Sequence, residues 1–142
     1  MDALEKLSAF EEIRQLLSRR TRLIDGKHWD QLADLYTDDV AAHHTQRPRA
    51  VAPWSITCAQ SLRVCGQFMR VCGQFIQVHL PEIELLSPLA ARGVVPMEDL
   101  LLWAEDGVQH WVHGYGHYHQ EYVKMERGWL NSDHRLTRQY LQ

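Results

Sequence analysis

Segments with strand character fill the second half of this 142-residue chain and restrict its fold more than any other feature. They are residues 77–83, 89–105, 108–125 and 129–140. Their alternation and their β-branched and aromatic residues favour strands, and Asp106-Gly107 is a strong signal for a hairpin between two of them. Strands that follow one another through tight turns predict an antiparallel meander.

The first half is expected to form helices that cover one face of this sheet. Apolar residues recur every three or four positions in residues 4–24, which predicts an amphipathic helix. They are Leu4, Leu7, Phe10, Ile13 and Leu17. Gly26 is expected to end the helix in the left-handed conformation, and a shorter helix over residues 28–36 and a short strand over residues 40–44 should follow. Helices followed by antiparallel strands predict an α+β fold, with a curved sheet and a pocket on its concave side.

Composition limits the class of partner. A chain of 142 residues with 45% hydrophobic content is expected to form one domain, residues 1–142. The net charge of -3 and the lack of a basic run argue against nucleic-acid binding and favour a small-molecule partner. No apolar run reaches the length of a membrane span, and the first residues are unlike a signal peptide, so we expect a cytoplasmic protein.

A tandem repeat stands between the two halves. Residues 63–69 read Arg-Val-Cys-Gly-Gln-Phe-Met, and residues 70–76 repeat them with Ile in the last place. Seven residues make about two helical turns, so a helix here would align one apolar seam from Cys58 to Ile76. We expect that seam to pack against another subunit of a homo-oligomer.

His79 is the first candidate for chemistry. In a strand over residues 77–83 it points to the opposite side from Val78 and Leu80. If that side lines a pocket, His79 is a natural general base, because the ordinary pKa of histidine lies near neutrality. A core histidine held by a backbone carbonyl is the alternative. Asp25 is equally open to two interpretations, as a carboxylate that orients an imidazole or as a residue that ends the first helix.

Several short motifs resemble the SnoaL-like, scytalone dehydratase-like group of the nuclear-transport-factor-like superfamily. They lie at residues 11–14, 24–30, 36–40, 79–83, 97–99, 114–118, 128–129 and 136–138. The resemblance covers about residues 7–40 and 77–140, in the order expected for that family. It has no counterpart between about residues 45 and 76, where the tandem repeat lies.

This resemblance implies a cone-shaped α+β barrel with helices over the concave face of the sheet, a deep pocket and no cofactor. The family includes dehydratases and a dehydrochlorinase, which remove a proton and expel a leaving group. At the matching positions Asp25 would orient the base His79, Asp99 would assist the leaving group, and Arg138 would supply positive charge. A tyrosine of the dehydratases is replaced by Arg20, a fixed cation, so their substrate class does not carry over.

Four residues are assigned to substrate binding: Arg20, Met97, Tyr115 and His117. His117 also shares one side of a strand with His113 and His119, a pattern that can bind a metal. No carboxylate spacing typical of a metal site accompanies these histidines, so we expect pocket-lining or solvent-facing side chains and no metal.

Together these residues predict a cofactor-independent lyase or isomerase that acts on a small hydrophobic carbonyl or hydroxyl compound through a His79–Asp25 dyad. A non-catalytic ligand-binding protein of the same fold is the alternative, and an assembly role for the helix-rich half is a third. Contact between Asp25 and His79 would favour the enzyme. The trimers and dimers common in the family agree with the expected homo-oligomer.

Overall fold

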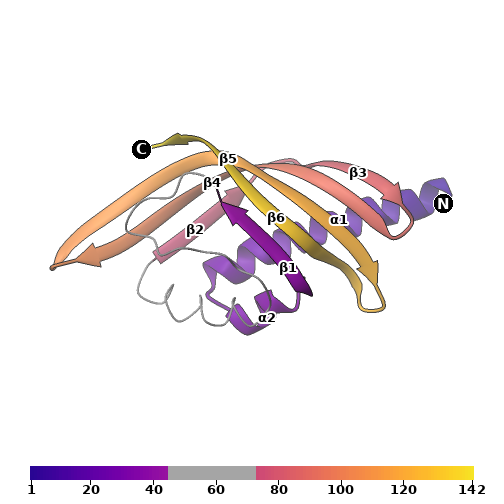
Figure 1. The fold of residues 1–142 in the computed structure, drawn as a ribbon, viewed down its shortest axis with the longest axis horizontal. Helices are drawn as coiled ribbons and strands as arrows, with labels where there is room; N and C mark the ends of the chain where they lie inside the picture. Colours follow the sequence, from indigo (N-terminus) through magenta and orange to yellow (C-terminus); the bar gives the residue numbers. More distant parts are fainter. Residues whose placement is uncertain (45–72) are drawn as a thin grey trace.

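The computed structural model describes residues 1–44 and 73–142, which form two helices and a six-stranded sheet (Figure 1). The elements are α1 (Ala3–Asp25), α2 (Trp29–Ala33), β1 (Tyr36–His44), β2 (Gly73–Val78), β3 (Glu82–Ser87), β4 (Ala90–Glu105), β5 (Val108–Met125) and β6 (Gly128–Leu141). The three long strands expected from the sequence are confirmed almost residue for residue. Asp106 and Gly107 both have positive φ, as a tight hairpin between β4 and β5 requires.

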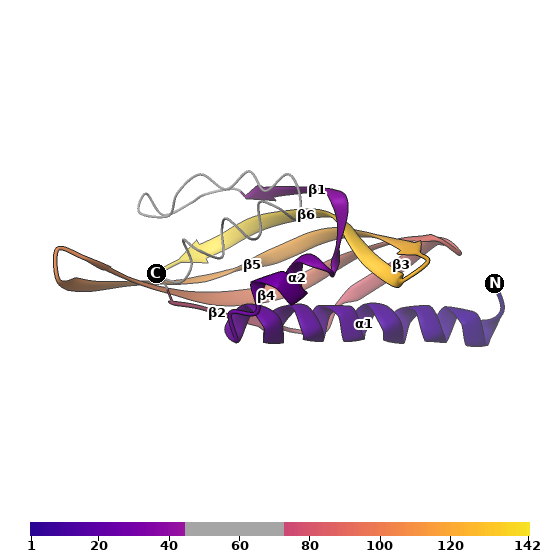
Figure 2. The ribbon, with the colours of Figure 1, turned by 90° about the horizontal axis from the view of Figure 1, so that it is seen from below.

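The strand order is β1-β6-β5-β4-β2, and β3 also pairs with β4. β4, β5 and β6 form the expected antiparallel meander, whereas β1 runs parallel to β6. The sheet is strongly curved, and α1 lies along its concave face (Figures 1 and 2). The predicted α+β fold is therefore confirmed, with one parallel pair at an edge of the sheet.

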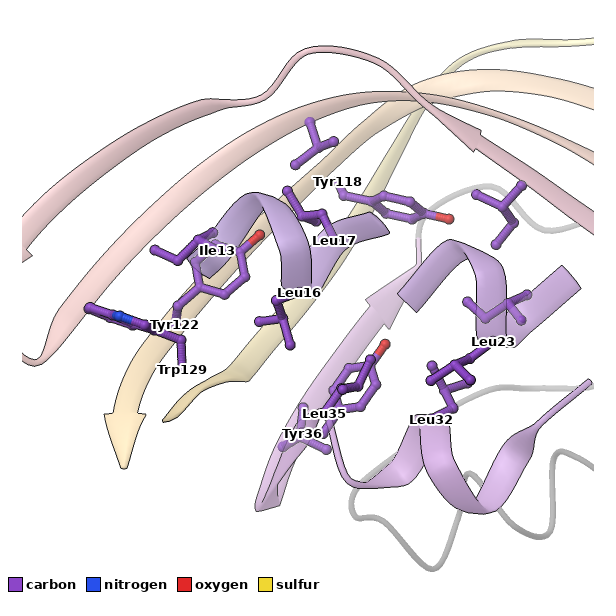
Figure 3. Close-up of a cluster of buried hydrophobic side chains, with 14 of the residues drawn as sticks. Ile13, Leu16, Leu17, Leu23, Leu32, Leu35, Tyr36, Tyr118, Tyr122 and Trp129 are labelled. Carbon is purple, nitrogen blue, oxygen red and sulfur yellow. The ribbon is translucent and has the colours of Figure 1, made fainter. Parts of the chain in front are cut away.

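Alternation along the strands gives the sheet a buried concave face and a more exposed outer face. On β5 the buried side chains are Tyr118, Gln120 and Tyr122, two residues apart. Figure 3 shows the side chains of α1 that meet this face. They include Ile13, Leu16 and Leu17, all of them buried, whereas the buried Leu23 lies beside Leu32 of α2 (Figure 3). The core therefore lies between α1 and the sheet, and polar side chains on the same face are enclosed with it.

α1 begins and ends differently from the expectation. Asp2 and Glu5 form a capping box at its start, and Leu4 and Leu7 are 76% and 65% exposed. The stripe that the sequence predicts therefore becomes buried only from the middle of the helix. The helix ends at Asp25 as expected, but Gly26 has a φ of -80°, so its predicted left-handed conformation is wrong; Lys27 has the positive φ instead.

The second helix is shorter than expected because the chain joins the sheet early. α2 ends at Ala33, and Tyr36 is already paired with Asn131 of β6. The backbone N–H of Asn131 also donates to the carbonyl of Leu35 at 2.9 Å. These contacts with β6 replace the last turn of the predicted helix over residues 28–36, and they start β1 before Val40.

β2 corrects the expectation of a helix that continues to Ile76. Residues 73–78 pair with β4, and Ile76 is buried in the core of its own chain. The other seam residues lie outside the described part of the chain: Cys58, Leu62, Cys65, Met69 and Cys72. The strand expected over residues 77–83 is divided into β2 and β3, with His79 between them. Within residues 1–44 and 73–142, no helix is long and apolar enough to cross a membrane.

Candidate functional site

Arg20 places a charge inside the concave face of the sheet. It follows Ile13, Leu16 and Leu17 on the buried side of α1, so helical spacing turns its guanidinium toward the sheet. Nε donates a hydrogen bond to the Tyr36 hydroxyl at 2.5 Å, and the guanidinium lies 4.6 Å from the centre of the Tyr118 ring. Burial opposes the charge, but interactions with the Tyr36 and Tyr118 hydroxyls raise the pKa of Arg20 above its usual range. Arg20 is therefore a permanent cation.

His134 of β6 lies beside this cation. The residue is 3% exposed, its Nε2 is 3.4 Å from Arg20 Nη2, and its Nδ1 is 2.8 Å from the Gln120 amide. A guanidinium nitrogen can only donate, so a hydrogen bond from Arg20 requires Nε2 to accept and Nδ1 to carry the hydrogen. In the structure Gln120 Nε2 faces Nδ1 and Gln120 Oε1 accepts from the Tyr122 hydroxyl. Exchanging the two ends of the amide, which are equivalent in shape, turns the oxygen toward Nδ1 and Nε2 toward the hydroxyl.

Asp99 and Arg138 form a second charged group on the concave face. Both Asp99 oxygens accept hydrogen bonds from Arg138, at 2.6 and 2.8 Å, and both side chains are almost fully buried. This is the bidentate geometry of an ionised carboxylate, whereas the family resemblance implies an Asp99 that assists the leaving group. Asp99 is on β4 and Arg138 is on β6. β5 lies between these two strands and carries Gly114 opposite Asp99. A methyl group on Gly114 would overlap Arg138 Nη1.

Asp25 and His79 lie in different surroundings. Asp25 Oδ1 accepts a hydrogen bond from the backbone N–H of Ile76 at 2.9 Å, which joins the end of α1 to β2. The His79 side chain is 61% exposed, and its Nε2 is 4.0 Å from an oxygen of Glu98. Among the described residues, no hydrogen bond connects Asp25 with His79. Ile76 and Val78 face the core, so alternation directs Gln77 and His79 to the outer face.

The remaining predicted site residues divide between the two faces. Met97 is buried beside Asp99 on the concave face. Tyr115 is 41% exposed and lies against His113 and Tyr140, and His117 belongs to the same outer side of β5.

The histidines of the outer face have partners of their own. Nε2 of His113 lies 3.2 Å from Glu98, and Nε2 of His119 lies 2.9 Å from the Thr137 hydroxyl. No cluster suited to a metal ion occurs in the described ranges, 1–44 and 73–142.

Sequence reasoning missed His134, Gln120 and Tyr36, although one signal for His134 is present. His134, Leu136 and Arg138 share one parity in β6, and the matching position of Arg138 in the family already marks that parity as inward-facing. Gln120 could be found only from the strand register, which pairs it with His134 across β5 and β6.

Comparisons with known proteins agree with this architecture. The SnoaL-like domain profile matches residues 5–134. A crystal structure of a putative scytalone dehydratase from Novosphingobium aromaticivorans superimposes with a TM-score of 0.84 at 14% identity, covering 99% of this chain and 91% of that one. A hexachlorocyclohexane dehydrochlorinase of type 2 gives 0.82 at 14% identity, with 99% and 92% covered.

A third solved structure, a protein of unknown function from Mycobacterium tuberculosis, gives a TM-score of 0.75 at 19% identity, covering 98% of this chain and 77% of that one. No curated protein sequence matches this chain. At these identities the solved structures establish the fold alone, whereas the domain profile spans most of the sequence. This chain therefore belongs to the SnoaL-like family.

Proposed function

We propose that this protein is a lyase or isomerase that transfers a proton on a small hydrophobic carbonyl or hydroxyl compound and needs no cofactor. The observation that carries the proposal is the pair of Arg20 and His134, 3.4 Å apart on the concave face. An imidazole can accept a proton, and a guanidinium beside it can stabilise the negative charge that develops on a substrate oxygen. Structural neighbours named as a dehydratase and a dehydrochlorinase are compatible with this class of reaction.

The other groups on this face have supporting roles in the proposal. Burial raises the pKa of Tyr118, although Arg20 lowers it in part, so the Tyr118 hydroxyl stays protonated and can donate to a substrate oxygen. Met97 contributes an apolar wall. The Asp99–Arg138 pair leaves little net charge at its end of the site, because each group neutralises the other.

Two assignments of the base belong to the proposal. His134 already lies on the concave face next to the cation. The dyad predicted from the sequence requires His79 to leave Glu98 and turn toward Asp25, whose Oδ1 accepts from Ile76. His134 is the base that the geometry favours, and the dyad remains a prediction that the same variants test.

The test is solvent-proton exchange and elimination on a panel of hydrophobic ketones and β-hydroxy carbonyl compounds in D2O, followed by NMR. If His134 is the base, His134→Gln lowers the rate of deuterium incorporation by at least about a hundredfold, the usual contribution of a general base. His79→Gln and Asp25→Asn then stay near the wild-type rate. The reverse pattern would assign the base to the dyad, and exchange that survives all three substitutions would contradict both assignments.

A non-catalytic ligand-binding protein is the second candidate. It is favoured by the positions of Asp25 and His79, which the structure holds with different partners, and by the closed Asp99–Arg138 pair. Compounds that bind on the concave face without any deuterium exchange in the wild-type protein would establish this role and exclude the enzyme.

We also propose that the chain assembles as a homodimer or homotrimer. Large apolar side chains remain exposed on the outer side of the hairpin end of the sheet, among them Trp111, Tyr115 and Tyr140. Exposed aromatic groups of this kind are typical of surfaces that become buried in an assembly.

A further inference from the structure

We propose that the natural ligand of the concave face is a hydrophobic carboxylate whose two oxygens bind the Nη1–Nη2 edge of the Arg20 guanidinium. The location of the ligand rests on the proposed function, but its charge follows from Arg20 alone. Nε of Arg20 donates its hydrogen bond to the Tyr36 hydroxyl, so the Nη1–Nη2 edge is the one left for a ligand. A planar carboxylate matches that edge with two parallel hydrogen bonds.

The first observation behind this proposal is a hydrogen-bond donor without an acceptor. Arg20 Nη1 is buried and has no hydrogen-bond partner within the described part of the chain. The other buried polar atoms without a partner there are neutral: Trp29 Nε1, Thr37 Oγ1, Trp129 Nε1 and Asn131 Oδ1. Nη2 is also weakly engaged, since its contact with His134 is 3.4 Å long. An incoming acceptor can therefore take both nitrogens of the edge without breaking a short hydrogen bond.

The second observation is a buried positive charge without a counter-ion. Arg138, on the same face, is neutralised by Asp99, but no carboxylate of residues 1–44 or 73–142 forms an ion pair with Arg20. Residues 45–72 contain four arginines and neither Asp nor Glu, so their sequence offers no side-chain carboxylate to this cation.

The neighbouring tyrosines do not supply the missing negative charge. Burial raises the pKa of Tyr118 and Tyr122 above their ordinary value, although Arg20 lowers both in part. Both therefore stay neutral at physiological pH and offer only dipoles and, in Tyr118, a ring face. A cation enclosed among apolar and neutral groups is unfavourable unless an anion joins it. A ligand that brings a carboxylate supplies that anion, and its apolar part can pack against the surrounding aromatic side chains.

The experiment compares 2-naphthoate with 2-naphthamide, which share size and apolar surface and differ in charge. Affinities are measured by calorimetry on the full-length chain. We expect naphthoate to bind at least about thirtyfold more tightly, because a desolvated charge pair is lost with the amide. Arg20→Met should abolish that preference. Arg19→Met is the matched control, since Arg19 is the preceding residue of α1 and is exposed, and it should retain the preference.

Equal affinities for the two probes, lack of binding by naphthoate, or an unchanged preference in Arg20→Met would overturn the proposal. Thermal unfolding verifies that Arg20→Met is folded, and Arg20→Gln serves as a second neutral variant. If neither variant folds, the comparison of the two probes on the wild-type protein still decides the outcome. A preference for naphthoate without deuterium exchange on any compound would support the ligand class and contradict the proposed reaction. Deuterium exchange on neutral ketones without a preference for naphthoate would support the proposed reaction and contradict the ligand class.

Discussion

Two ion pairs with similar N–O distances lie in opposite environments on this sheet. Asp99 and Arg138 are buried on the concave face, whereas Glu84 and Arg92 are about 60% exposed on the outer face, at 2.6 Å. Water screens the outer pair and leaves the buried one unscreened. The energetic value of these pairs should therefore differ although their distances do not.

The first prediction compares one carboxylate from each pair. Asp99→Asn should lower the free energy of unfolding by roughly 3–5 kcal/mol, because it leaves the Arg138 charge buried without a partner. Glu84→Gln should change it by less than about 1 kcal/mol. Urea denaturation of both variants measures the difference. Similar losses in the two variants would mean that Asp99 and Arg138 are hydrated in solution.

At the same scale, the sequence identified charges more readily than the neutral groups that surround them. Arg20, Asp99 and Arg138 were predicted because ionisable side chains match motif positions. His134 was not predicted, since the sequence of an alternating strand is compatible with a histidine on either the buried or the exposed side. Its burial is decided by the bulges and register of β6 against β5, which require coordinates.

α1 shows why a correct element can have a partly incorrect buried face. Its periodicity places Leu4, Leu7 and Ile13 on one stripe, but the first turns of the helix carry no cover from the sheet, and only Ile13 is fully buried (Figure 2). The sequence determines which side of a helix is apolar, whereas the length of the opposing sheet determines how much of that side is covered.

The second prediction follows from this difference within one helix. Ile13→Ala should destabilise the protein by about 2–5 kcal/mol, because it leaves a cavity between α1 and the sheet. Leu7→Ala, on the same stripe, should cost less than about 0.5 kcal/mol. Thermal or urea unfolding can compare the two. A large loss for Leu7→Ala would show that another subunit covers this end of the helix.

β2 could not be predicted, because its sequence satisfies two periods. Ile76 is the last residue of the predicted heptad seam, but it also alternates with Val78 on one side of a strand, and a short apolar run alone does not separate helix from strand. Pairing with β4 decides in favour of the strand, and Asp25 supports it by accepting from the backbone of Ile76.

The third prediction separates the structural role of Asp25 from a catalytic one. Asp25→Ala should destabilise the chain by about 1–2 kcal/mol, since the Ile76 N–H loses its acceptor. Asp25→Asn keeps an oxygen acceptor and should cost clearly less. Unfolding measurements on both variants test the structural role. If Asp25→Asn nevertheless lowers turnover by orders of magnitude once a substrate is known, Asp25 orients a base as the dyad hypothesis requires.

At the scale of the whole molecule, the order of elements predicted the layers well. Helices in the first half and a meander in the second are sufficient to indicate one helical layer over a curved sheet. The sequence could not show which strand joins β1, because the parallel pairing of β1 with β6 joins residues 36–44 to residues 131–136 and depends on these long-range contacts. That pairing closes one side of the concave face.

The outer face of the sheet leads to the last prediction, which concerns assembly. Trp111 and Tyr140 are 55% and 57% exposed, and the Tyr115 and Tyr140 rings lie 6.4 Å apart. A monomer would leave this aromatic group in water, so light scattering of the full-length chain should give the mass of a dimer or a trimer.

Replacing both Trp111 and Tyr140 by Lys should shift that mass toward the single chain, because charges at the centre of an apolar contact disfavour association. Leu89→Lys is the control, since Leu89 is 62% exposed in the turn between β3 and β4, away from the aromatic group. A monomeric wild-type chain would exclude the assembly. An oligomer that persists in the double variant would place the interface on another surface.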